Sequence, residues 1–325
     1  MTHRICGIML ACLAVLSVQP GAAQAASWPD RPVRILVGWA AGGATDVVAR
    51  LVAQHLGESL GQQFVVENRP GAGGNIAADL AARSAADGYT LIFLTSAHAI
   101  NATLYKNLTF DPVGSFQPVA MVGFMTQLFV VNSKLPHQSV SELIAAAKAR
   151  PGQLTYASAG SGSSSHLAVE QLRAKAGLDL RHIPYKGTSQ YLADLVAGRV
   201  DMAIDSSTAL APLVQKGELR ALAVSSSKRS QFFPDLPTVA EAGVPGYGVD
   251  LWFGFLGPAG IPADVLARMN DAIRRVASSA EVTKRLNGMG LSVAAGYTPQ
   301  QFTQRLQADI AMYAETIKAS GARVD

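Results

Sequence analysis

Cysteine is scarce in this chain, and charge is sparse. Of its 325 residues only two are cysteines, and both, Cys6 and Cys12, lie in the first 25 residues. The rest of the chain therefore has no thiol for a disulfide, a thiolate metal site or a cysteine nucleophile. Charged residues make up 15% of the chain and hydrophobic residues 49%, a composition that excludes global disorder.

Runs of basic residues are also lacking, although the formal net charge is +4. The densest basic pairs are Lys228-Arg229 and Arg274-Arg275, and no aromatic residues interleave with them. A nucleic-acid groove usually requires a basic patch, so we expect no nucleic-acid partner. A mildly positive surface is compatible with a small anionic ligand.

Long apolar segments are absent after the N-terminal residues. Residues 1–25 have the pattern of a signal peptide, with Arg4, an apolar stretch from Ile5 to Val18, and the small-x-small cleavage site Ala23-Gln24-Ala25. The apolar stretch is shorter than the roughly 20 residues that span a membrane. We expect a periplasmic protein whose signal peptide is cleaved near Ala25.

Short β-type runs alternate with helical patterns from residue 33 onward, which predicts an α/β fold with parallel sheets. Strands are expected at 33–39, 64–67 and 89–94, and then at 154–157, 182–184, 200–204 and 219–224. Capping boxes begin at Ser139 and Thr298, and Thr45 or Asp46 is the expected N-cap of the first helix. No long linker separates the two sets. We therefore predict two lobes joined by short crossing strands, one formed by 26–125 with 227–325 and the other by 126–226, with a hinge and a central cleft.

Each predicted lobe contains a strand that leads into a glycine-rich loop opening a helix. The loops are Gly42-Gly43-Ala44-Thr45-Asp46 and Gly160-Ser161-Gly162-Ser163-Ser164. Glycine allows the backbone to approach a ligand closely, and a helix N-terminus offers free N–H groups and a partial positive charge. Two such loops facing one cleft can hold a carboxylate without an arginine. Glycine–serine loops are also common turns, so a purely structural role is the alternative for each.

Motifs of enzymes are absent or incomplete. The spacing from Gly38 to Gly43 fits a phosphate-binding loop, but Ala44 stands where that loop needs lysine. The histidines have no metal-ligand spacing, and Ser164 lies in Gly-x-Ser-x-His rather than Gly-x-Ser-x-Gly. We expect no catalytic residue, metal site or cofactor. A secreted α/β hydrolase using Ser164 and His166 is the alternative.

Three further positions have both a functional and a structural interpretation. His166 near the start of the second loop's helix orients the loop, contacts the ligand, or caps and packs. Asp205 at the end of a predicted strand faces the cleft or serves a turn. The Trp252-Phe253 pair lines a pocket or packs in the core.

Motifs in a fixed order run through nearly the whole chain. They are Trp28-Pro29-x-Arg31-Pro32-Val33, Gly42-Gly43-x-x-Asp46, Val66-Glu67-Asn68-Arg69-Pro70-Gly71-Ala72-Gly73-Gly74-Asn75, Asp87-Gly88-Tyr89-Thr90-Leu91, Gly160-x-Gly162-Ser163-x-x-His166-Leu167, Pro184-Tyr185-Lys186-Gly187, Leu236-Pro237-Thr238-Val239 and Trp252-Phe253-Gly254. This set resembles the Bug-type substrate-binding proteins of tripartite tricarboxylate transporters. The resemblance implies a type II periplasmic-binding-protein fold.

The resemblance also implies a receptor that closes on a small mono- or dicarboxylate and presents it to the membrane components of such a transporter. The same clamshell can instead serve a sensor kinase, and we expect a monomer. Positions implied to hold the carboxylate are Gly42, Gly43, Ala44, Thr45, Asp46, Ser158, Gly160, Gly162, Ser163 and Ser164. Positions implied for the rest of the ligand are Thr95, Ser96, His98, Tyr185, Lys186 and Asp205.

Overall fold

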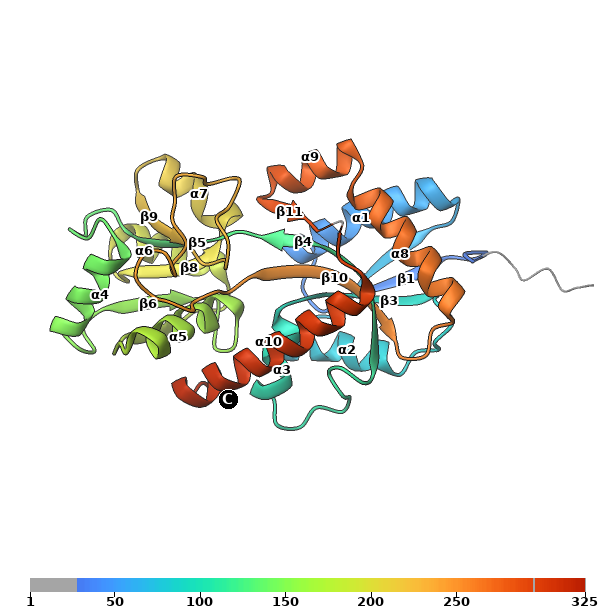
Figure 1. The fold of residues 1–325 in the computed structure, drawn as a ribbon, viewed down its shortest axis with the longest axis horizontal. Helices are drawn as coiled ribbons and strands as arrows, with labels where there is room; N and C mark the ends of the chain where they lie inside the picture. Colours follow the sequence, from blue (N-terminus) through green and yellow to red (C-terminus); the bar gives the residue numbers. More distant parts are fainter. Residues whose placement is uncertain (1–27, 295, 325) are drawn as a thin grey trace, which may run out of the picture.

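The computed structural model describes residues 28–294 and 296–324, so the expected signal peptide lies outside the described residues. These residues form two lobes side by side, each built around one sheet (Figure 1). The strand order is β11-β4-β10-β3-β1-β2 in the first sheet and β7-β6-β8-β5-β9 in the second. No helix in the described ranges is long and apolar enough to cross a membrane.

The strands have the following bounds. The first sheet comprises β1 (Val33–Val37), β2 (Phe64–Asn68), β3 (Thr90–Thr95), β4 (Phe116–Met125), β10 (Leu251–Pro258) and β11 (Leu291–Val293). The second comprises β5 (Gln127–Asn132), β6 (Thr155–Ser158), β7 (Arg181–Pro184), β8 (Met202–Ser206) and β9 (Leu219–Val224).

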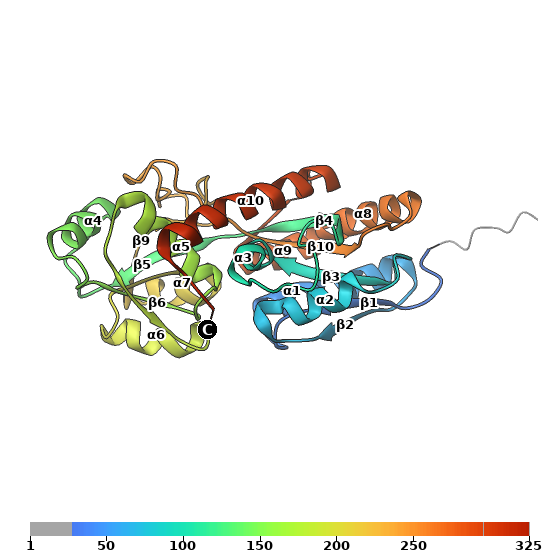
Figure 2. The same cartoon turned by 90° about the horizontal axis from the view of Figure 1, so that it is seen from below.

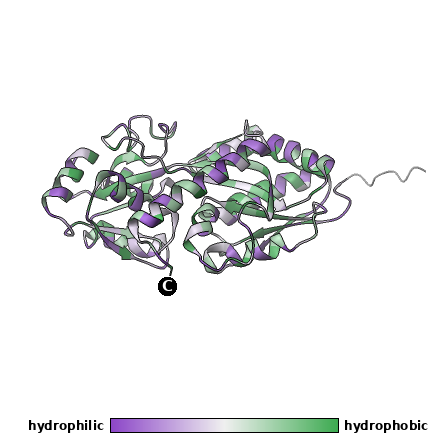
Figure 3. Cartoon of the chain, turned by 60° about the horizontal axis from the view of Figure 1, so that its bottom comes forward, coloured by the Kyte–Doolittle hydropathy of each residue, from purple (hydrophilic) through white to green (hydrophobic). Residues whose placement is uncertain are grey.

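Helices cover both faces of each sheet. The first lobe contains α1 (Ala44–Leu60), the 3-10 turn η1 (Ala72–Gly74), α2 (Asn75–Ala82), α3 (Ala97–Leu104), α8 (Ala263–Ala277), α9 (Ala280–Gly288) and α10 (Pro299–Ser320). The second contains α4 (Val140–Ala149), α5 (Ser164–Ala176), α6 (Thr188–Ala197) and α7 (Ser207–Gln215). Figure 3 shows hydrophobic residues gathered on the strands and hydrophilic ones on the outward helices.

Both sheets are mixed, so the prediction of parallel sheets is wrong in part. β1 pairs in parallel with β2 and β3, and β6 with β7 and β8. β10 is antiparallel to β3 and β4, and β5 is antiparallel to β8 and β9. β5 enters the second lobe and β10 enters the first from the side of the lobe boundary. The carboxyl ends of β3 and β8 point toward that boundary. β10 is therefore antiparallel to β3, and β5 is antiparallel to β8.

The chain crosses to the second lobe between Met125 and Gln127 and returns through residues 225–250 (Figure 1). At the crossing point, the Thr126 N–H donates to the carbonyl of Gly290, and the Thr126 hydroxyl lies 2.7 Å from that of Ser230. The returning segment is tied to β9 by a parallel bridge between Val224 and Thr238. These bonds tie together the two places where the chain passes between the lobes.

Helix boundaries follow the sequence signals only in part. The capping box at Thr298 and Gln301 is confirmed, with proline at the start of α10. The Ser139 hydroxyl accepts from the Glu142 N–H as expected, but the Glu142 carboxylate accepts from Gln138 instead of completing the box. The N-cap prediction for α1 is wrong, because the helix starts at Ala44 with Gly43 as its cap.

Candidate functional site

A cavity of about 150 Å³ lies between the lobes, where the second glycine-rich loop approaches the first lobe; the first loop, from Gly42 to Asp46, is not part of its lining. The first lobe contributes Trp39, Gly73, Ala97, Asn101, Leu104 and Tyr105. The second contributes Ala159, Gly160, Ser161, Gly162 and Ser163. Of the predicted site residues, Gly160, Gly162 and Ser163 line this cavity.

The first loop is ordered by the carboxylate of Asp46. Gly42 has a φ of +83°, and its N–H donates to Asp46 Oδ2 at 2.9 Å. Arg50 Nε and Asn68 Nδ2 also donate to Asp46, at 3.0 and 2.8 Å. Burial raises the pKa of this carboxyl, but the bonds from Arg50, Gly42 and Asn68 outweigh it and hold the pKa below its ordinary value. Asp46 thus shapes the loop with its oxygens already occupied.

The first loop still has free donors. Gly42, Gly43 and Ala44 are exposed, and Thr45 is half-buried. The N–H groups of Ala44 and Thr45 belong to the first turn of α1, where no intrahelical acceptor exists. The loop therefore offers backbone donors and the positive end of a helix.

The second loop is fixed by hydroxyl groups. Ser158 Oγ accepts from the Gly160 N–H at 3.1 Å and bonds His182 Nε2 at 2.6 Å. Ser163 caps α5, accepting from the His166 N–H at 3.2 Å and donating to the Gly160 carbonyl at 2.7 Å. Ser158 and Ser163 therefore hold the turn, and the N–H of Gly160 is used within the loop.

His166 secures the other glycine of this loop. Its Nδ1 accepts from the Gly162 N–H at 3.0 Å. Burial, aided by the positive charge of Arg173, lowers the pKa of His166 to about 4, so the ring is neutral at neutral pH. The structural interpretation of His166 thus has direct support. The free backbone donors here are the first-turn N–H groups of Ser164 and Ser165.

The predicted residues after β3 are turned to the core of the first lobe. Thr95 Oγ1 accepts from the Ala97 N–H at 3.3 Å, and Ser96 is fully buried. His98 Nε2 donates to the Pro112 carbonyl at 2.8 Å, and its ring packs against Phe116. Burial lowers the pKa of His98 to about 4. None of the three lines the cavity.

The remaining predicted residues lie in the second lobe, outside the cavity lining. The Tyr185 hydroxyl donates to Asp194 at 2.7 Å, and Lys186 is exposed. Asp205 is buried and accepts from the hydroxyls of Thr188 and Tyr191 at 2.8 and 2.7 Å. Burial raises the pKa of Asp205, although these bonds partly oppose the shift.

Eight cavity residues were not predicted: Trp39, Gly73, Ala97, Asn101, Leu104, Tyr105, Ala159 and Ser161. Trp39 carried a usable signal, since it ends the predicted first strand and precedes the first glycine loop. Among the residues that the structure describes, it is one of four large hydrophobic residues left exposed, at 36%. Asn101, Leu104 and Tyr105 lie at the end of α3, where the helix pattern alone suggests only packing.

The geometry of a serine hydrolase is not formed. His166 Nδ1 is occupied by the Gly162 N–H, and its Nε2 faces Glu170 at 3.9 Å, so Ser164 has no base. The serine that does bond a histidine is Ser158, and it is fully buried. No cluster of three or more metal-ligand side chains occurs in residues 28–294 and 296–324.

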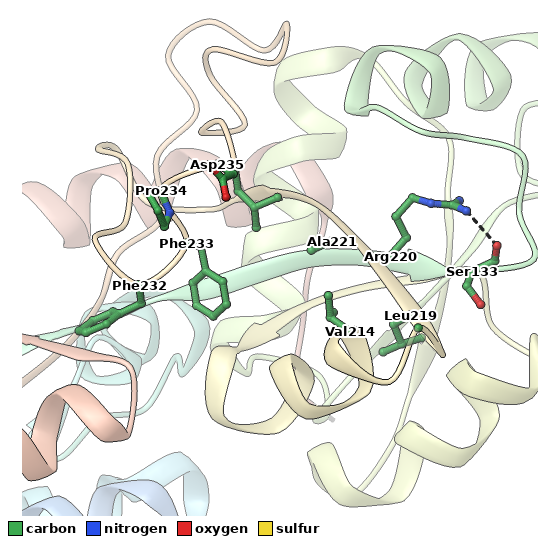
Figure 4. Close-up of a pocket in the computed structure, with 11 residues that line it drawn as sticks. Ser133, Val214, Leu219, Arg220, Ala221, Phe232, Phe233, Pro234 and Asp235 are labelled. Atoms are coloured by element: carbon green, nitrogen blue, oxygen red, sulfur yellow. Dashed lines mark hydrogen bonds between the residues drawn. The ribbon is translucent and has the colours of Figure 1, made fainter.

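A larger hollow of about 560 Å³ lies on the second lobe, away from both loops (Figure 4). Its walls include Val214, Leu219, Phe233 and Arg220. The Arg220 guanidinium donates to the carbonyls of Ser133, Leu135 and His137 at 2.9–3.1 Å. Its charge is therefore engaged by backbone and does not form an open anion site.

Known proteins match this chain over most of its length. The family model described as "Tripartite tricarboxylate transporter family receptor" matches residues 48–322. Protein BugT of Bordetella pertussis is 36% identical over 321 residues, covering 97% of this chain and 98% of its own. A protein encoded in the tcbD-tcbE intergenic region of Pseudomonas sp. is 38% identical over 271 residues, covering 83% and 81%.

Solved structures agree with this assignment. A protein of R. palustris solved with adipate has a TM-score of 0.80 and 39% identity, over 91% of this chain and 100% of its own. MatC from Rhodopseudomonas palustris, solved with bound malate, has a TM-score of 0.77 and 33% identity, over 89% and 100%. The periplasmic binding protein BugD has a TM-score of 0.77 and 32% identity, over 91% of this chain and 99% of its own. The two-lobed fold and the sequence together place this chain in the tripartite tricarboxylate transporter receptor family.

Proposed function

We propose that this protein is a periplasmic solute-binding receptor that captures a small mono- or dicarboxylate and presents it to the membrane components of a tripartite tricarboxylate transporter. Residues 1–25 direct export and are removed near Ala25. The protein binds its ligand as a monomer and does not transform it chemically.

The observation that carries this proposal is a cavity between the lobes that the second helix-opening loop lines and that Trp39, three residues before Gly42 of the first loop, also lines. No charged side chain lines that cavity. First-turn N–H groups of α1 and α5 supply donors and two partial positive charges, which suit one carboxylate. An apolar wall from Trp39, Leu104 and Tyr105 suits the carbon chain of the ligand.

Relatives support the choice of ligand. Proteins of this architecture have been solved with adipate and with malate, both dicarboxylates. The transporter family match favours transport over sensor-kinase signalling. The hydrolase alternative lacks its serine–histidine pair.

The loops act when the lobes move together. The moving bodies are the two lobes, and the returning segment moves with the second, because Val239, Val244 and Tyr247 pack in the core of that lobe. The proposed contact set is the first loop from Gly42 to Asp46 and the second from Ser158 to Ser164. Exclusion of water on closing strengthens the amide–carboxylate bonds. Differential affinity of the ligand for the two arrangements drives the movement.

Isothermal titration calorimetry with a panel of aliphatic, hydroxylated and aromatic carboxylates tests the proposal. We expect at least one acid to bind and to raise the melting temperature by mass action. Amides of the same acids are the matched control, since they keep the carbon chain and lose the charge. A flat response to the whole panel, or equal binding of acid and amide, contradicts the proposal.

A further inference from the structure

The second loop packs directly on two apolar side chains of the first lobe. A Cβ added to Gly162 would lie 2.2 Å from Leu104 Cδ2 and 3.4 Å from Val324 Cγ1. Leu104 ends α3, and Val324 follows α10, which stops at its cap Gly321. Gly162 also has a φ of +80°, so both its backbone conformation and this contact favour glycine.

The contact belongs to an apolar cluster that crosses from one lobe to the other. Leu167 of α5 is fully buried in the same cluster as Leu104, Tyr313 and Ile317, with Val324 packed against it. α10 contacts α3 and β4 of the first lobe and α5 of the second. Figure 2 shows α10 running from the first lobe to the side of α5, where the C-terminal segment turns past it.

We propose that Leu104 and Val324 are positioning residues for the second loop. By packing on Gly162 they hold the loop toward the first lobe, where it lines the cavity together with Trp39, the residue that leads into the first loop. Leu104 also lines the cavity, whereas Val324 does not. The C-terminal segment therefore tunes binding without touching the ligand. This inference rests on the proposed function, because it assigns the second loop to ligand binding.

Changes at Val324 and at Leu104 should affect ligand affinity in different ways. Apparent affinity is the intrinsic affinity multiplied by the fraction of molecules in the competent arrangement. A change at Val324 alters that fraction alone and must weaken the binding of every ligand by one factor. A change at Leu104 alters both the fraction and the cavity wall, so different ligands respond unequally.

The first test needs no ligand. Both cysteines precede residue 28, so exposed Gln54 on α1 and Lys148 on α4 can be replaced by spin-labelled cysteines on a background with Cys6 and Cys12 changed to serine. Pulsed electron paramagnetic resonance then gives the distance distribution between the lobes. We expect Val324→Ser to shift or broaden it. Val65→Ser makes the same change at a valine 47% exposed on β2 and leaves the distribution unaltered.

The second test measures affinity for adipate and malate. Val324→Ser is expected to weaken the binding of both acids by the same factor, about threefold to tenfold. Leu104→Ala weakens them by unequal factors. A Val324→Ser protein with unchanged distances and affinities overturns the inference, and so does one whose losses differ between the two acids. If the unaltered protein binds neither acid, the proposed function fails for them, while the ligand-free distances still decide whether Val324 positions the loop.

Discussion

The imidazole rings of His166 and His182 are stacked, with centroids 4.1 Å apart and planes 13° from parallel. Each ring bonds one part of the second loop, His166 through the Gly162 N–H and His182 through the Ser158 hydroxyl. The ring of Tyr156 continues the stack at 4.7 Å from His182. Two stacked rings cannot both become cationic cheaply, so the loop depends on their remaining neutral.

Acid should therefore destabilise the protein. Burial lowers the pKa of both His166 and His182 to about 4 from an ordinary value of 6.5, with repulsion between the two rings adding to the shift at His182. Between these pH values the folded protein binds fewer protons than the unfolded chain. The stabilisation is thus complete above pH 6.5 and lost as the pH falls toward 4. We expect a loss on the order of 2 kcal/mol per histidine.

Urea unfolding at a series of pH values measures how the free energy of unfolding declines as the pH falls. Asn at position 166 offers an oxygen acceptor for the Gly162 N–H but does not titrate. His166→Asn should accordingly flatten the decline between pH 6.5 and 4. Parallel curves for the variant and the unaltered protein would show that His166 does not carry the effect.

Asp46 should affect ligand affinity through the shape of the first loop. Asp46→Asn removes the charge that organises Gly42, Arg50 and Asn68. We expect about tenfold weaker binding, in line with the loss of charge-assisted hydrogen bonds. Asp79→Asn is the matched control, since Asp79 pairs with Arg83 at the same helical spacing on α2. Equal losses in calorimetry for the two variants would count against a loop-specific role.

Trp39 should report ligand binding by fluorescence. Of the three tryptophans, Trp28 and Trp252 are buried, and Trp39 is 36% exposed and lines the cavity. Ligand and lobe closure should remove Trp39 from water and shift its emission to shorter wavelength. Trp39→Phe should abolish the response with binding retained in calorimetry. A full spectral response in that variant would place the ligand elsewhere.

Arg305 should stabilise the region where the chain returns to the first lobe. Its guanidinium bonds Asp250 at 3.1 Å and Asp309 at 2.8 Å, and Asp309 also accepts from Trp252 Nε1 at 2.7 Å. Arg305→Met leaves two largely buried carboxylates without a cation, and we expect it to cost about 3 kcal/mol of unfolding free energy. Arg83→Met, which breaks an exposed pair, should cost less than about 1 kcal/mol. If chemical denaturation shows that the two variants lose equal amounts of unfolding free energy, this prediction is contradicted.

The sequence allowed the two-lobed α/β fold to be predicted because hydrophobic periodicity and glycine loops are local signals. The order of β10 within the first sheet was not predictable in this way, since it depends on where the chain re-enters the lobe. Burial of Trp252 and Phe253 on that strand confirms the core interpretation.

The loops were identified, but their internal bonding was not. The N–H groups of Gly42, Gly160 and Gly162 are taken by Asp46, Ser158 and His166. His182, which orders Ser158, comes from β7 and meets the loop only in the folded lobe. Leu104 and Tyr105 reach the cavity for the same tertiary reason, because α3 ends beside it.

Amide chemical shifts during titration with a bound carboxylate test the central claim most directly. If one carboxylate is held by both lobes, the N–H signals of Ala44 and Thr45 and those of Ser164 and Ser165 must move together, with one dissociation constant. Movement confined to one of the two loops, or to residues outside both, would contradict the account.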